Sequence, residues 1–301
     1  MSELLEVTVI DSDPATYVQN HSVVRREFSH LTQDSGNVSW LIDVDGVGIF
    51  VKTAGYDRQP PPGAPIPYFD HAGRVQLLRN AINLARSCDH PALPPLLNVI
   101  ESPSGPMLIY AAAPGELVGV PAELRTDPNS SYRRFAQLPG EDLLTVFDTL
   151  IDLHRRLADV GWVAGDLYDR SLIVDFADLR LHVCDLDSYR RGPTVNDMGR
   201  MFGSSRFMAP EEFQLGAAID QRTTVFNLGR LIWHFGTRLT EDAKYFCGSS
   251  ELATIVGQAV QRDPADRYPT VADFAAAWQN LGRGQTMINF RRGMTSRSGP
   301  A

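Results

Sequence analysis

The first third of the chain alternates apolar and polar residues in a way that predicts antiparallel strands. Two apolar runs within residues 38–52 flank Asp45-Gly46, a residue pair that favours a tight turn, so this segment is expected to form a hairpin. Further strands are expected at residues 1–30, Leu96–Glu101 and Met107–Ala113.

Other segments carry apolar residues at the spacing of a helix. In residues 142–160, Leu143, Val146, Phe147 and Leu150 fall on one face, which is typical of an amphipathic helix. Comparable helices are expected at Gly73–Ser87, Thr223–Phe235 and Val271–Leu281. Residues 53–71 contain five prolines and are expected to form a surface insertion.

Composition limits the classes of function. The 301 residues are 43% apolar, which is enough for a substantial core, and the formal charge of −8 argues against nucleic-acid binding. Cys88, Cys184 and Cys247 have no metal-binding spacing and fit reduced thiols in a cytosol. The sequence has neither a signal peptide at its start nor an apolar run of about 20 residues, so a cytoplasmic protein without a membrane span is expected.

The candidate chemistry lies between Gly161 and Glu211. Asp166 and Asp185 are nineteen positions apart, and each follows an apolar run that predicts a buried element. The segment Gly203–Glu211 then reads Gly-Ser-Ser-Arg-Phe-Met-Ala-Pro-Glu. This segment resembles the end of a protein-kinase activation segment, and the two acidic loops before it have the order and spacing of the catalytic and metal-binding loops. The chain therefore resembles a divergent bacterial protein kinase of the eukaryotic serine/threonine type, over about residues 25–282.

The resemblance implies an α+β, two-lobed fold that binds ATP with Mg²⁺ or Mn²⁺ and acts on protein substrates. Residues 1–113 would form the N-lobe, with an antiparallel sheet, the nucleotide-binding strands and a regulatory helix. Residues 114–282 would form a helical C-lobe with the catalytic loop and the activation segment. Residues 283–301 carry several arginines and no acid, and are expected to form a basic flexible tail.

Three residues would carry the reaction. Asp166 would orient the acceptor hydroxyl, Asp185 would hold the metal, and Lys52 would bind phosphates. The choice of Lys52 rests also on usage in this chain, because its 28 basic residues comprise 26 arginines and only two lysines, Lys52 and Lys244. Ser171 stands where a second metal ligand is usual, and Asp187, in the place of a glycine, is a further candidate ligand.

The resemblance also implies a nucleotide-binding set. Gly36 is the last glycine of a reduced glycine-rich loop, Tyr110 falls at the gatekeeper position, and the adenine edge would be read by backbone groups next to it. The complete set is Lys52, Gly36, Val38, Tyr110, Ala111, Ala113 and, as a ribose contact, Glu116.

Several positions depart from the family pattern. Residues 73–87 contain no carboxylate to pair with Lys52, and Gln76, Asn80 and Asn83 could present an amide carbonyl instead. Asp166 is preceded by Ala164-Gly165 and lacks the arginine that binds a phosphorylated activation loop, so activity is expected to be independent of such phosphorylation.

A second group of positions concerns the support of the catalytic loop. Tyr168 replaces the usual lysine, and Thr224 replaces an aspartate that holds the loop, so other support is expected there. Glu211 and Arg267 stand where a buried ion pair is usual.

Two other functions stay open. A pseudokinase would bind a nucleotide or a partner without turnover, as the absent helix glutamate and Tyr168, Ser171 and Thr224 indicate. A small-molecule phosphotransferase is the third reading, because Gly165-Asp166 resembles the catalytic loop of aminoglycoside and choline kinases, although those enzymes lack the Ala-Pro-Glu segment and the helix around Arg267.

Overall fold

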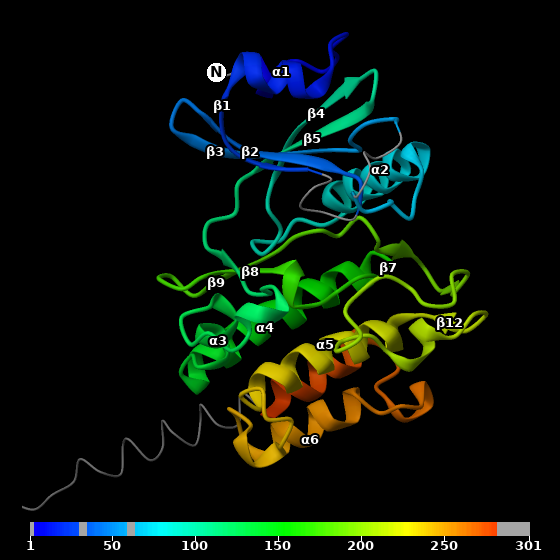
Figure 1. Ribbon diagram of the computed structural model, residues 1–301. Coiled ribbons are helices and arrows are strands. Elements are labelled where there is room, and N and C mark those ends of the chain that lie inside the picture. Colours follow the sequence, from blue (N-terminus) through cyan, green and yellow to red (C-terminus); the bar gives the residue numbers. More distant parts are fainter. Residues whose placement is uncertain (1–2, 30–34, 59–63, 282–301) are drawn as a thin grey trace, which may run out of the picture. The chain divides into compact units, whose positions relative to one another are not determined.

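The structure, a computed structural model, describes residues 3–29, 35–58 and 64–281 (Figure 1). These residues form two compact units. The first comprises the chain up to Gly115 together with His182–Tyr189, and the second comprises Glu116–Leu181 and the described chain from Arg190 onward. An antiparallel sheet dominates the first unit and helices dominate the second, which confirms the predicted α+β class.

The first unit contains a five-stranded sheet in the order β1-β2-β3-β5-β4, with all neighbouring strands antiparallel. The strands are β1 (Val23–Phe28), β2 (Val38–Val44), β3 (Val47–Thr53), β4 (Leu96–Ser102) and β5 (Gly105–Ala111). Asp45 and Gly46 both have positive φ angles, 53° and 82°, and connect β2 to β3 as the sequence predicted.

Both faces of this sheet are covered by helices (Figure 1). Helix α2 (His71–Ser87) packs Leu78 and Ile82 against Leu108 of β5. On the opposite face, α1 (Pro14–His21) packs Tyr17 and Val18 into a cluster built around Trp40. The sequence predicted α2 but placed only strands in residues 1–30, so α1 is a correction.

The second unit is built around α5 (Gln221–Gly236), which packs between α4 (Gly140–Asp159) and α6 (Ser250–Ala259). Helix α5 is buried on nearly all sides, because almost every residue from Thr223 to Gly236 is inaccessible to solvent. The other helices are α3 (Ser131–Ala136) and residues 271–281. Short 3-10 turns include η3 (Asp169–Ser171) and η4 (Pro210–Phe213).

Short strands frame the loops of the second unit. They are β6 (Glu116–Leu117), β7 (Trp162–Val163), β8 (Leu172–Asp175), β9 (Arg180–Val183), β10 (Arg190–Arg191), β11 (Thr194–Val195) and β12 (Ala218–Ile219). Strand β9 carries the chain back into the first unit, which it leaves after Tyr189. The candidate catalytic loop follows β7 and the candidate metal-binding loop follows β9.

Within the described ranges, no helix has both the length and the apolar character needed to cross a membrane. The predicted basic tail, the tip of the proline-rich insertion and the first part of the reduced glycine-rich loop lie outside the described residues.

Candidate functional site

Lys52 lies on β3 with its ammonium between two carboxylates. Its Nζ atom is 2.5 Å from Oδ1 of Asp185 and 2.5 Å from Oδ2 of Asp187. Lys52 is only 9% exposed, and burial alone would lower its pKa, but the two carboxylates raise that pKa above its usual value. The structure thus brings together Lys52, Asp185 and Asp187, all of them predicted site residues.

The loop that carries these aspartates is held by the backbone of the first unit. At the end of β9, the Val183 N–H donates to the carbonyl of Ala92 at 2.8 Å. Asp185 then adopts a left-handed backbone with a φ of 62°, a conformation that is uncommon for a residue other than glycine and that clusters at functional sites. Lys52 holds the pKa of Asp185 below its usual range, so this carboxylate is an anion at neutral pH.

The two aspartates differ in their exposure to solvent. The Asp185 side chain is 55% exposed and the Asp187 side chain is 10% exposed. An exposed carboxylate can accept a cation from solution without first being uncovered. Asp185 is therefore the better candidate for a metal ligand of the two.

Helix α2 contacts the Asp187 loop through an amide. The Asn80 side chain donates to the carbonyls of Asp187, at 2.8 Å, and Tyr189, at 2.5 Å. The prediction that an amide carbonyl from this helix reaches Lys52 was therefore wrong for Asn80, which uses its N–H groups on the loop instead. Gln76 and Asn83 are exposed.

The sheet register corrects one nucleotide-binding prediction. Ser39 pairs with Lys52 across the strands and Val38 pairs with Thr53, so the side chain of Val38 points to the face opposite Lys52. There it is buried in the cluster around Trp40, beneath α1. The structure therefore gives Val38 a core position and not one beside Lys52.

An aromatic surface lies on the same sheet face as Lys52. Phe50 and Tyr110 pair across β3 and β5, and the Phe28 ring contacts the Phe50 ring at a centroid distance of 6.0 Å. Burial and the nearby Asp187 raise the pKa of Tyr110, so its hydroxyl is neutral. Phe28 and Phe50 were not predicted from the sequence, because the strand register that places them on the same face as Lys52 was not known.

The remaining predicted nucleotide contacts in the first unit are backbone positions. Gly36 has a φ of 80°, and a Cβ atom there would lie 2.5 Å from Cγ of Pro67, so only glycine fits this turn. The Ala111 N–H donates to the carbonyl of Pro95, the residue just before β4. Ala113 follows the end of β5, and its predicted contact with adenine stays a prediction.

Asp166 lies in the second unit and also has a left-handed backbone, with a φ of 58°. A Cβ atom at Gly203 would lie 3.5 Å from Oδ1 of Asp166, so the activation segment passes directly beside this carboxylate. The Ala164 N–H donates to the Thr224 hydroxyl oxygen at 2.9 Å. The expectation that Thr224 cannot hold the loop was therefore wrong, because its hydroxyl supplies the acceptor.

Two predicted contacts in the second unit already have other partners. The Ser171 hydroxyl is buried, donates to the Asp166 carbonyl at 3.2 Å and accepts from the Tyr168 N–H at 3.4 Å. Those bonds give Ser171 a structural role in the turn, so we do not retain it as a metal ligand. Glu116 pairs with Arg134 at 2.8 Å.

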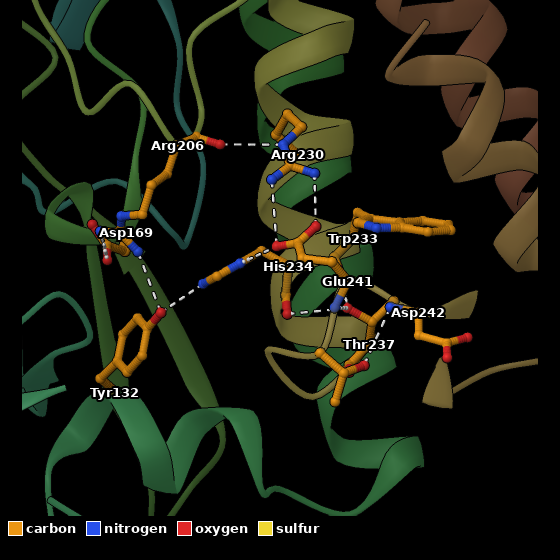
Figure 2. A network of polar contacts seen from close by, with 10 residues as sticks. Tyr132, Asp169, Arg206, Arg230, Trp233, His234, Thr237, Glu241 and Asp242 are labelled. Atoms are coloured by element: carbon orange, nitrogen blue, oxygen red, sulfur yellow. Dashed lines mark hydrogen bonds and ion pairs between the residues drawn. The ribbon is translucent and has the colours of Figure 1, made fainter. Parts of the chain in front are cut away.

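A polar network supports the candidate catalytic loop (Figure 2). Arg206 of the activation segment lies 2.6 Å from the carboxylate of Asp169, which is 1% exposed, and donates to the Tyr132 hydroxyl at 3.3 Å. That hydroxyl lies 2.6 Å from Nε2 of His234 on α5. Sequence reasoning missed this network, because its members are far apart in the chain.

The network continues from α5 to Glu241 (Figure 2). The Glu241 carboxylate lies 2.6 Å from Nδ1 of His234 and 3.0 Å from Arg230, which also donates to the Arg206 carbonyl. The bond to His234 and the pairing with Arg230 lower the pKa of Glu241 to about 2. Arg206 is therefore connected to α5 twice. Its side chain reaches His234 through the Tyr132 hydroxyl, and its carbonyl accepts from Arg230.

The predicted ion pair between Glu211 and Arg267 is present. Both terminal guanidinium nitrogens of the buried Arg267 reach the Glu211 carboxylate, at 2.6 and 2.9 Å. The neighbouring Glu212 accepts from the Ala209 N–H and the Asn227 amide, and burial raises its pKa to about 7. The segment that ends in Ala-Pro-Glu is thus anchored by two neighbouring buried carboxyl groups, one in an ion pair and one in hydrogen bonds.

The donor chemistry of the first unit fits a magnesium ion. Among the described residues, no group of three or more His, Cys, Asp or Glu side chains could hold a metal. Kinase-type Mg²⁺ sites need only one or two carboxylates, because phosphates and waters complete the shell. Asp185 satisfies that requirement, whereas the approach of Asp166 to Lys52 and Asp185 stays a prediction.

No protein-family model matches the sequence. The chain is 26% identical over 106 residues to serine/threonine-protein kinase 1 of African swine fever virus (isolate Pig/Kenya/KEN-50/1950). The matched region covers 34% of this chain and 36% of the viral protein. The chain thus has a distant and partial similarity to a serine/threonine kinase, and its sheet and helical units agree with a kinase-like fold.

Proposed function

We propose that this chain is a serine/threonine protein kinase that transfers the γ-phosphoryl group of ATP to hydroxyls of protein substrates with the help of Mg²⁺ or Mn²⁺. The observation that carries the proposal is the pairing of Lys52 with Asp185. A buried ammonium on the third strand faces a partly exposed carboxylate on the loop after β9. Binding of ATP with a metal ion requires this pair of charges, a positive one for the phosphates and a negative one for the metal.

Lys52 would bind the α- and β-phosphates and Asp185 would hold the cation. The bound cation would neutralise negative charge on the phosphates. Lys52 suits its role because its charge is compact and its flexible stem can turn from a carboxylate to a phosphate oxygen. The flat apolar rings of Phe28 and Phe50, on the same sheet face, make both residues candidates for contact with the base.

Asp166 would orient the acceptor hydroxyl. As the hydroxyl oxygen bonds to the γ-phosphorus, the bond from that phosphorus to the bridging oxygen breaks and ADP leaves, while the hydroxyl proton passes to Asp166. The left-handed backbone of Asp166 and the adjacent Gly203 support this role, because strain and close backbone approach are common at reacting positions.

The direct test is transfer of label from γ-labelled ATP to a generic protein acceptor in the presence of Mg²⁺ or Mn²⁺. Lys52→Met and Asp166→Asn should each abolish transfer. Lys244→Met is the matched control, because it removes the only other lysine, whose side chain is 64% exposed. Transfer that persists in both site variants would refute the proposed roles.

A pseudokinase is the second candidate, and the engaged hydroxyl of Ser171 favours it. In this reading a nucleotide binds beside Lys52 but no second metal ligand is provided. ATP should then raise the thermal stability without transfer, and at 100 times its dissociation constant it should add about 2.7 kcal/mol. Stabilisation that is lost in Lys52→Met, with no labelled product in any variant, would favour this function over the first.

A further inference from the structure

We propose that Asp185 and Asp187 divide their tasks, with Asp187 acting as the fixed counter-ion that positions Lys52 and Asp185 remaining able to exchange Lys52 for a metal ion. This proposal rests on the proposed function for the role of Asp185. The role of Asp187 follows from the described contacts alone. Asp187 is thus a positioning residue and not a second metal ligand.

The first step is the need of Lys52 for an anion. A buried ammonium without a paired charge is strongly disfavoured, and Lys52 is almost fully buried. Helix α2 contains no Asp or Glu along its whole length, so it cannot supply the anion. Within the part of the chain that the structure describes, the ion pairs of Lys52 are those with Asp185 and Asp187.

The second step is the difference between the two anions. When a metal or a phosphate binds, one carboxylate must release Lys52 or share it. The exposed carboxylate of Asp185 can do so, because water and ligand can reach it. Asp187 is mostly enclosed, so releasing Lys52 would leave a buried carboxyl without its charged partner. Lys52 therefore keeps Asp187 while the partner of Asp185 changes.

The third step is how Asp187 is held in place. The Asn80 amide donates to the carbonyls of Asp187 and Tyr189, on either side of Ser188. These two bonds attach α2 to the loop segment that carries the counter-ion. A movement of α2 would therefore move this loop, and with it the Asp187 carboxylate that pairs with Lys52. These hydrogen bonds take the place of a direct ion pair between the helix and Lys52.

The test is a double-mutant cycle on the nucleotide-free protein, measured by urea unfolding. The variants are Lys52→Met, Asp185→Asn, Asp187→Asn and the two double variants. The coupling between Lys52 and Asp187 should exceed that between Lys52 and Asp185 by about tenfold in the unfolding equilibrium constant. Equal couplings, or a larger one for Asp185, would overturn the proposed division.

Metal binding gives an independent readout. Titration of Mn²⁺ into each variant in the presence of ATP should lose affinity in Asp185→Asn and change less than about threefold in Asp187→Asn. A comparable loss in both variants would make Asp187 a metal ligand and refute the proposal. If the wild type binds neither ATP nor Mn²⁺, the proposed function fails, while the unfolding cycle still decides the role of Asp187.

Asn80→Ala keeps the proposal testable if Asp187→Asn does not fold. Loss of the two bonds should accelerate amide hydrogen exchange in residues 184–189. In an active protein it should raise the KM for ATP more than it lowers kcat. Asn83→Ala, an exposed position on the same helix, is the matched control. Exchange and KM that change equally in the two variants would contradict the coupling of α2 to the loop.

Discussion

The guanidinium of Arg206 lies 2.6 Å from the carboxylate of Asp169, and this pair joins the candidate activation segment to the candidate catalytic loop within the second unit. Asp169 is almost completely buried, and Arg206 is the cation paired with it among the described residues. Gly165 stands where the kinase resemblance would place an arginine that binds a phosphorylated loop, and Arg206 fixes the segment without a phosphate. The relationship explains how the segment can be ordered in an unmodified chain.

We therefore predict that phosphatase treatment leaves activity unchanged, while Arg206→Ala lowers it. Breaking a buried ion pair from one side costs about 3–5 kcal/mol, and less is expected here because Arg206 is partly exposed. Urea unfolding measures the loss of stability, and limited proteolysis between residues 196 and 208 measures the loss of order. Activity that requires a phosphate on Ser188, Tyr189 or Thr194 would contradict the prediction.

Arg180→Ala is the control for the Arg206 variant. Arg180 pairs with Asp178 on the surface, and both side chains are 60% exposed. An exposed pair of this kind contributes about 0–1 kcal/mol. A similar loss of stability in the two variants would mean that burial of Asp169 has no special effect.

Glu212 should make stability fall as pH rises. Burial raises the pKa of Glu212 to about 7, so the folded protein binds its proton more tightly than the unfolded chain does. The stabilisation is complete below the unfolded pKa and is lost as pH rises through the folded value. Between about pH 5 and about pH 8 the difference amounts to about 2–3 kcal/mol.

Glu212→Gln tests this titration because the amide keeps an oxygen acceptor for the Ala209 N–H. Urea unfolding should find the variant more stable than the wild type at about pH 8 and nearly equal to it at about pH 5. Glu251→Gln, at an exposed carboxylate, serves as the control. A pH dependence that is the same in the wild type and Glu212→Gln would refute the assignment.

Local patterns predicted much of the fold, because they depend on neighbouring residues. The β2–β3 hairpin followed from its turn pair, and α2, α4 and α5 followed from helical spacing, with ends that shifted by one or two residues. Helix α1 was missed, since its eight residues have few apolar positions and their burial depends on Trp40 of the distant sheet.

The candidate site was predicted only as far as single positions allow. Lys52, Asp185 and Asp187 were recognisable from their places in the motifs, but the sequence could not show that Lys52 pairs with both carboxylates at once, across more than 130 positions. Val38 was expected at the nucleotide from the resemblance alone, and its pairing with Thr53, one residue out of step with Lys52, turns its side chain to the other face. The Arg206–Asp169 pair has no local signal at all, as an arginine in a loop is usually solvated.

The cysteine at the candidate site should be unreactive. Burial and the nearby Asp185 raise the pKa of Cys184 to about 12, and burial raises that of Cys247 to about 11. At neutral pH almost none of either thiol is the reactive thiolate. Iodoacetamide should therefore label the native protein slowly and the urea-unfolded protein at the rate of a free thiol. Mass spectrometry that finds rapid native labelling of Cys184 would contradict this environment.

Thr224 should support the catalytic loop through its hydroxyl. The Thr224 oxygen accepts from the buried Ala164 N–H, two residues before Asp166. Thr224→Val keeps the shape but leaves this N–H unpaired, which costs about 1–3 kcal/mol, and the displaced loop should lower kcat more than it raises the KM for ATP. Thr224→Ser keeps the acceptor and should restore both stability and rate.

Because a merely structural loss would reduce the amount of folded enzyme without lowering kcat per folded molecule, rates must be normalised to the folded fraction. Equal kcat values for the valine and serine variants would mean that the hydroxyl does not position Asp166.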